Sequence, residues 1–343
     1  MNLKNTVQIY LFFLIGICLF SCRNKKDVDV SAIDLEVKIE RFDQEMNSLT
    51  AQNFQNQLPA LQKKYGFFYQ DYMEGMLSVG DINSPEYHQN LKIVLSSPDY
   101  KALKDEVAAK FPDMKKHEEE LSDGFKHIKY YYPKQSIPRI ITFFSGFTVQ
   151  TPIGDNYIGV GLDMFLGSNS KFYPALRSSV PAYISRRFTA ENITPRVMEA
   201  FTREELFPES DQSTSLLQKM IYNGKVLFFM DAIMPEVPDS LKIGYTSVQQ
   251  KWADEFESGI WGYFLQENLL YETDYMKIQK YLTEAPFTPG VGEKSDSAPK
   301  LANFIGWKIV KQYMERNSVV TLQELMKDTD AQKILEKAKY HPD

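Results

Sequence analysis

The chain has only two cysteines, Cys18 and Cys22, and both lie at its N-terminal end. Everything after residue 22 therefore folds without disulfide bonds and without thiolate-bound metal. That part of the chain has to be stabilised by burying apolar side chains. Hydrophobic residues make up 43% of the 343 residues, which is ordinary for a globular protein.

The N-terminal segment has the pattern of a secretory signal peptide. A lysine precedes an apolar run over residues 9–20. A helix that spans a bilayer needs about 20 residues, so this run is too short to be a good membrane anchor. We expect residues 1–21 to be removed as a signal peptide. An N-terminal membrane helix remains an alternative.

The apolar run ends in Leu19-Phe20-Ser21-Cys22, which resembles the lipobox of bacterial lipoproteins. Phe20 is bulkier than the residue usually found there. The pattern predicts that the Cys22 thiol carries a diacylglycerol and that polar residues 22–33 form a tether. An ordinary signal peptide followed by an incidental cysteine is the other interpretation.

The charge of the chain argues against a nucleic-acid partner. Lysine and arginine total 39 against 45 acidic residues, which gives a net charge of −6. We therefore expect an acidic body held beside a membrane by its lipid.

The body has the patterns of an α+β fold. Alternating apolar residues over 35–39 predict a strand, and residues 43–132 have helical spacing. Short aromatic and β-branched runs with glycine turns predict further strands at 140–144, 147–149 and 157–160. The remainder is helical. We expect one predominantly helical domain over residues 34–343, with a small central sheet.

Several helix starts can be read from capping residues. Thr194-Pro195 predicts one, because proline suits the first helical position. Three further pairs have the capping-box form, in which a hydroxyl residue is followed three positions later by Gln or Glu. They are Ser215 and Gln218, Thr246 and Gln249, and Thr321 and Glu324.

No catalytic motif is visible, so we expect no catalytic residue, no metal and no cofactor. The chain lacks the Gly-x-Ser-x-Gly of serine hydrolases, the His-Glu-x-x-His of zinc enzymes and a phosphate-binding glycine loop. The four histidines are scattered. Acids near aromatic residues, such as Asp231, Glu255 and Glu257, could do acid–base chemistry, but charged helix faces explain them better. Asp163 fits a turn.

Seven segments, in order along nearly the whole chain, together resemble the gliding motility lipoprotein GldB family of the Bacteroidetes. They are Val37–Asp43, Gly161–Gly167, Tyr183–Arg187, Met220–Lys225, Ala285–Thr288, Gly306–Val310 and Leu335–Pro342. The resemblance implies a membrane-anchored envelope lipoprotein needed for gliding. Gliding in these bacteria is tied to the type IX secretion machinery. The resemblance implies no known enzymatic activity.

This family is also distantly similar to zinc-metallopeptidase-like (zincin) domains. The matching stretch is Pro195–Thr202, where Met198 and Thr202 replace the two metal-binding histidines and Glu199 keeps the general-base position. Met and Thr cannot supply imidazole ligands, so the similarity implies a peptidase-like scaffold without metal. Alternatively, Glu199 is simply a surface acid on a helix.

We therefore predict a non-catalytic envelope lipoprotein that faces the periplasm and holds a protein partner or peptide in a groove. Candidate groove residues are Tyr183, Arg186, Arg187 and Glu199; the Arg pair alternatively forms a solvated turn. A hydrolase that uses carboxylates or a metal, and a purely structural protein, are the alternatives. Attachment to the inner or the outer membrane is left open.

Overall fold

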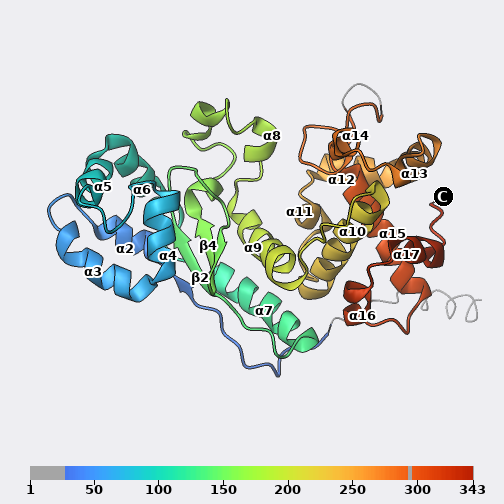
Figure 1. The fold of residues 1–343 in the computed structure, drawn as a ribbon, viewed down its shortest axis with the longest axis horizontal. Helices are drawn as coiled ribbons and strands as arrows, with labels where there is room; N and C mark the ends of the chain where they lie inside the picture. Colours follow the sequence, from blue (N-terminus) through green and yellow to red (C-terminus); the bar gives the residue numbers. More distant parts are fainter. Residues whose placement is uncertain (1–27, 293–295, 343) are drawn as a thin grey trace, which may run out of the picture.

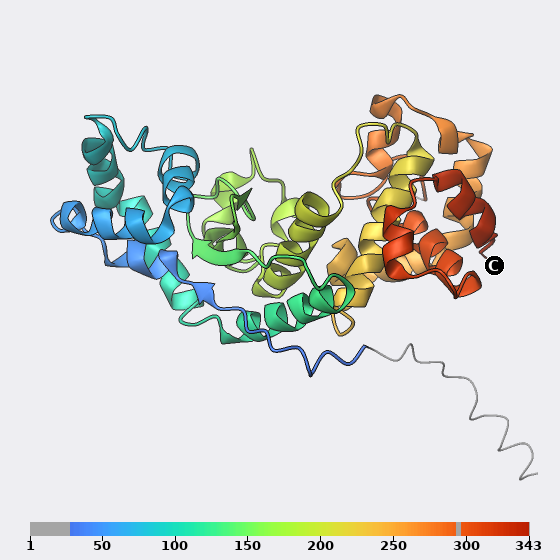
Figure 2. The same ribbon diagram turned by 60° about the horizontal axis from the view of Figure 1, so that its bottom comes forward.

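The computed structural model describes residues 28–292 and 296–342, so the predicted signal peptide and Cys22 lie outside the described residues. The strands and helices α2–α6 form one end of an elongated molecule, and helices α10–α17 form the other (Figures 1 and 2). Helices α7 and α9 lie between these two ends. The predicted α+β class is confirmed: the protein is mostly helical, with a small sheet.

The strands are β1 (Ile39–Glu40), β2 (Arg139–Phe143), β3 (Ile153–Gly154) and β4 (Tyr157–Gly161). The first helices are α2 (Phe42–Ser48), α3 (Phe54–Tyr65), α4 (Phe67–Asp71), α5 (Tyr87–Ser96), α6 (Pro98–Lys110), α7 (Lys115–Tyr131), α8 (Ala182–Ser185) and α9 (Ile193–Phe201). The later helices are α10 (Leu216–Ile233), α11 (Asp239–Ile243), α12 (Ser247–Glu255), α13 (Glu257–Gln266), α14 (Tyr275–Ile278), α15 (Leu301–Arg316), α16 (Leu322–Lys327) and α17 (Ala331–Ala338).

The sheet has the order β1-β2-β4-β3, with β1, β2 and β4 parallel and β3 antiparallel to β4. The strand predicted at 35–39 overlaps β1 only at Ile39. Side chains of α7 accept hydrogen bonds from the backbone of this segment. Ser122 Oγ accepts from the Val37 amide at 2.9 Å, and a Glu118 carboxylate oxygen accepts from Ile39, also at 2.9 Å.

The strand predicted at 147–149 is wrong. Phe147 has a φ of +68°, which is outside the extended region, and its amide donates to the Asp163 carboxylate at 2.7 Å. The segment is therefore a turn that follows β2. The other two predicted strands, at 140–144 and 157–160, correspond to β2 and β4.

Aromatic side chains fill the core between the sheet and the N-terminal helices. The fully buried Phe42 ring makes edge contacts with Tyr65, Phe68 and Tyr72, at centroid distances of 4.8, 5.1 and 4.8 Å. Phe68 then reaches Tyr157 of β4 at 5.1 Å. Such edge-to-face pairs contribute about 0.5–1.5 kcal/mol each beyond their burial.

The predicted capping boxes are confirmed at α10, α12 and α16, where both reciprocal hydrogen bonds are present. Helix α9 begins at Ile193 rather than after Thr194. The Thr194 hydroxyl instead donates to the Glu120 carboxylate of α7 at 2.6 Å. This tertiary contact uses the side chain that the local pattern assigned to a cap.

Helices α10 and α15 approach so closely that their backbones touch. A Cβ atom on Gly306 would lie 1.9 Å from the Met220 carbonyl oxygen, and one on Gly224 would lie 2.2 Å from the Gly306 oxygen. Only glycine fits at both positions, because the neighbouring atoms are backbone and cannot rotate away.

Gly306→Ala should therefore destabilise the protein by about 3 kcal/mol or more, since the two helices must separate. Gly262→Ala is the matched control. Gly262 lies inside α13 with no atom within 4 Å of an added Cβ, so alanine should stabilise by about 0.5–1 kcal/mol. Urea unfolding measures both changes, and equal effects would contradict the close contact.

Candidate functional site

The two arginines predicted for a groove lie where α8 meets the C-terminal helices. An Arg186 Nη donates to the Gly244 carbonyl at 2.9 Å, and the buried Arg187 donates to the Glu284 carboxylate. Tyr183 is half-buried on α8. The interpretation of the Arg pair as a solvated turn therefore does not describe Arg187, which bridges distant parts of the chain.

Arg187 requires a glycine opposite it. Gly244 has a φ of +80°, and a Cβ there would lie 2.2 Å from the guanidinium carbon of Arg187. Gly244 thus ends α11 in a left-handed conformation and also leaves the space that the guanidinium fills.

A lysine completes this contact between the segment after α8 and the C-terminal helices. Lys300, at the start of α15, donates to the same Glu284 oxygen at 2.7 Å and also to the Ile243 carbonyl. Burial lowers the pKa of Lys300 to about 8, against the opposing effect of Glu284. We call Arg187, Glu284 and Lys300 the ionic latch.

Glu199 lies beside this latch, held between two guanidinium groups of its own helix face. Arg196 donates to one carboxylate oxygen at 3.2 Å and Arg203 to the other at 2.9 Å. Burial alone would raise the pKa of Glu199, but these two arginines outweigh it, so the pKa is well below its usual range. A carboxylate whose pKa is held so low by two arginines is a weak base, so Glu199 is poorly suited to take up a proton at neutral pH.

The opposite face of α9 is packed into the core. Met198 and Thr202, the residues that the predicted peptidase similarity places at the two histidine positions, are fully buried. The Thr202 hydroxyl donates to the Met198 carbonyl at 2.7 Å, and a Cβ on Gly124 of α7 would lie 2.9 Å from the Met198 methyl carbon. Over residues 28–292 and 296–342, no group of three or more His, Cys, Asp or Glu residues could hold a metal ion.

The other acids considered from the sequence have separate partners. Asp231 accepts from Lys242 at 2.8 Å and from the Trp307 indole at 2.9 Å. Glu257 pairs with Lys308 at 2.9 Å and accepts from the Tyr340 hydroxyl at 2.8 Å. Asp231 and Glu257 each pair with a separate lysine. They therefore act as partners in ion pairs and do not form a carboxylate pair for acid–base chemistry.

Asp163 lies just after β4, at the carboxyl edge of the parallel strands. It stands in a short helical turn, so the turn predicted there is confirmed. Its Oδ2 accepts from the amides of Ser145 at 3.1 Å and Phe147 at 2.7 Å, while its Oδ1 has no hydrogen-bond partner among the described residues. The side chain is fully buried, and burial raises the pKa to about 6, against the opposing effect of these amides. Sequence reasoning could not find this shift, because it depends on complete burial.

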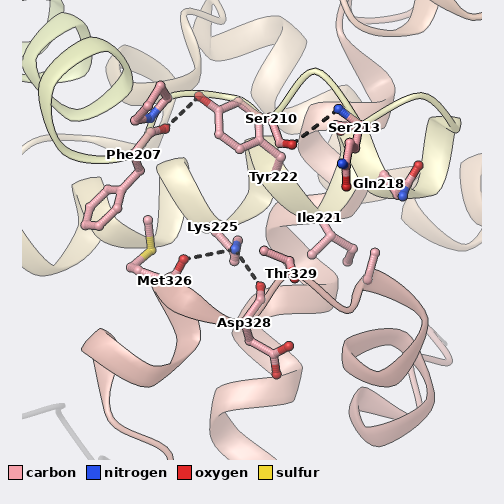
Figure 3. Close-up of a pocket in the computed structure, with 13 residues that line it drawn as sticks. Phe207, Ser210, Ser213, Gln218, Ile221, Tyr222, Lys225, Met326, Asp328 and Thr329 are labelled. Carbon is pink, nitrogen blue, oxygen red and sulfur yellow. Dashed lines mark hydrogen bonds between the residues drawn. The ribbon is translucent and has the colours of Figure 1, made fainter.

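A pocket of about 290 Å³ lies between the segment 207–213, α10 and the turn from α16 to α17 (Figure 3). Phe207, Ile221 and Met326 supply apolar surface, and the buried Lys225 contributes an ammonium group. Sequence reasoning missed this pocket, since Lys225 has no neighbouring motif that would mark it.

An exposed apolar surface was also missed. The described residues include ten exposed large hydrophobic side chains, and six of them lie within residues 248–276, on and between α12, α13 and α14. These residues are Val248, Phe256, Leu265, Tyr271, Tyr275 and Met276. We call this set the apolar edge.

The structure is thus a mostly helical α+β protein in which the predicted site residues Arg186 and Arg187 join the segment after α8 to the C-terminal helices. A family model described as gliding motility protein GldB matches residues 23–342, so the chain belongs to the GldB family of gliding motility lipoproteins. That family is not known for enzymatic activity. No curated protein and no solved structure matches the chain. In its described part, no helix has the length and apolar character needed to cross a bilayer.

Removing the anion of the ionic latch should destabilise the fold. Glu284→Gln leaves Arg187 and Lys300 buried without a carboxylate, which should cost about 2–4 kcal/mol in urea unfolding. The control is Glu255→Gln, which breaks an exposed pair with Lys251 and should change stability by less than about 0.5 kcal/mol. A latch variant as stable as this control would contradict the assignment.

Asp163 should make stability fall as pH rises. Its folded pKa of about 6 lies above the ordinary aspartate value of 3.8, so its contribution is fully present below pH 3.8 and is lost as pH rises through 6. Relative to Asp163→Asn, the unfolding free energy of the unmodified protein should drop by about 3 kcal/mol between pH 3.5 and 7.5. Urea titrations across this range measure it, and parallel curves for the two proteins would contradict the shift.

Proposed function

We propose that this protein is a lipid-anchored component of the cell envelope, facing the periplasm, that acts in gliding motility by holding another envelope protein. The observation that carries this proposal is the family match over residues 23–342. The lipobox at Cys22 supports the anchor. A link to type IX secretion is part of the proposal, because the resemblance to this family implies it.

We further propose that the protein does not catalyse a reaction. Glu199, the residue in the general-base position, is neutralised by Arg196 and Arg203. The histidine positions are taken by the fully buried Met198 and Thr202. Both observations favour a peptidase-like scaffold used only for binding; the zincin relationship itself stays a prediction, as does the single domain over residues 34–343.

The partner surface that we propose combines α8 with the apolar edge. These elements lie along the upper side of the molecule in the view of Figure 1. Tyr183 and Arg186 are partly exposed on α8, whereas Arg187 and Glu199 are the groups that hold α8 and α9 in place. Exposed aromatic residues and arginine are enriched in protein interfaces, and clustered exposed apolar side chains mark them.

In-cell photo-crosslinking tests this surface. A photo-reactive amino acid in place of Tyr183 or Met276 should capture the same envelope protein, which mass spectrometry identifies. Ile93 on α5 is the control, because it is similarly exposed at the other end of the molecule. Capture of the same protein from all three positions, or from none, would contradict the proposed surface and favour a purely structural role.

The lipid anchor is tested by substitution of Cys22 in the cells used for crosslinking. Cys22→Ala should abolish labelling by a fatty-acid probe and release the protein from the membrane fraction. A variant that is still labelled would contradict lipid attachment at Cys22. Serine at the same position serves as a second substitution, since it also lacks the thiol.

A further inference from the structure

The ammonium group of Lys225 is buried at the pocket of Figure 3, and no carboxylate of the described residues pairs with it. The residue is 8% exposed, and its Nζ donates to the backbone carbonyls of Met326 at 3.2 Å and Asp328 at 2.8 Å. Burial lowers the pKa of Lys225, and Asp328 opposes this effect only in part. The Asp328 carboxylate points away from Lys225 in Figure 3 and binds Lys333 at 2.8 Å instead.

The other strongly buried lysines of the described chain are paired differently. Lys242 binds the Asp231 carboxylate at 2.8 Å, and Lys300 binds Glu284 at 2.7 Å. A buried cation is normally accompanied by an anion, because removing its hydration is expensive. Lys225 has two carbonyl dipoles at the end of α16, so one of its three N–H donors is left for an anion in the pocket.

The rest of the pocket wall has an apolar part and a polar part. Phe207, Ile221 and Met326 lie on the apolar part. Ser213 and Gln218 lie on the polar part, and the Ser213 hydroxyl oxygen is buried with no hydrogen-bond partner in the part of the chain that the structure describes. An unpaired buried hydroxyl is costly, so it marks a place where a ligand amide could bind.

We propose that this pocket binds the carboxyl-terminal residue of a peptide chain. The terminal carboxylate accepts a hydrogen bond from Lys225, the apolar side chain lies against Phe207 and Met326, and the last amide pairs with Ser213. A volume of about 290 Å³ is at the lower end of ligand pockets, so it suits one residue and not a long chain.

This inference is independent of the proposed partner surface. The pocket is lined by segment 207–213, α10, α16 and α17, whereas the proposed surface is formed by α8 and the apolar edge. A fatty acid shares the carboxylate and the apolar group but has no amide for Ser213. The observations therefore favour the peptide terminus over the fatty acid.

Isothermal titration calorimetry on the full chain in detergent micelles tests the proposal, with empty micelles as the blank. The probes are N-acetyl-leucine, N-acetyl-leucinamide, which lacks the charge, and hexanoate, which lacks the amide. N-acetyl-leucine should bind at least about tenfold more tightly than either of the other two probes, because charge-assisted hydrogen bonds contribute more than neutral ones.

Lys225→Met should weaken N-acetyl-leucine binding by at least about tenfold. Lys327→Met is the control, because it removes the same charge from an exposed residue of α16 and should leave binding unchanged. Ser213→Ala, which leaves the Lys225 contacts in place, should weaken N-acetyl-leucine but not hexanoate. This second variant keeps the test valid if Lys225→Met fails to fold.

Three outcomes would overturn the inference. Equal binding of N-acetyl-leucine and its amide would remove the carboxylate from recognition. Tighter binding of hexanoate would replace the peptide terminus by a fatty acid. Absence of binding by every probe would leave Lys225 as a cap for α16 alone.

Discussion

The backbone contact between α10 and α15 is the constraint on which the C-terminal part of this protein depends. Without a cysteine after residue 22, that part is held by packing, and Gly224 and Gly306 let the two helices touch. The contact also positions the neighbours of Gly224. Asn223 accepts from Arg203 at 3.0 Å beside the ionic latch, and Lys225 reaches the pocket. Adjacent residues of α10 therefore contact Arg203, beside the ionic latch, and line the Lys225 pocket.

Buried cations give this acidic chain a second level of organisation. The ionic latch places two of them on one carboxylate, Glu284, and so joins α8 to the start of α15. Such an arrangement is weak evidence for high stability, because desolvation offsets much of the attraction. Its geometric effect is firmer: Arg187 fits only against Gly244, so the relative placement of α8 and α11 is specified by shape and by charge.

The fold was predictable where its determinants are local. Capping boxes at Ser215, Thr246 and Thr321 involve residues three positions apart, and all three formed as expected. The predicted strand at 147–149 failed because a buried acid, Asp163, draws the amide of Phe147 into a turn. That acid is 16 residues away, and an apolar, β-branched segment carries no sign of it.

The candidate site was less predictable for the same reason. Glu199 has local partners, Arg196 and Arg203, three and four residues away. The partners of Arg187 and Lys225 come from distant segments. Arg187 meets Glu284 across 97 residues of sequence, and Lys225 meets Asp328 across 103. A single sequence does not show which of many charges converge, whereas the periodic signals of helices and caps are repeated within a few residues.

The environments of Glu199 and Asp163 favour a binding role over a catalytic one for this protein. A general acid or base works best with a pKa near the operating pH and with access to substrate. Glu199 is near solvent, but two arginines keep its pKa far below that range. Asp163 has a pKa of about 6, but it is fully buried and holds two backbone amides. Neither combines the two requirements, whereas the exposed apolar edge and the Lys225 pocket each have the features of a surface that binds.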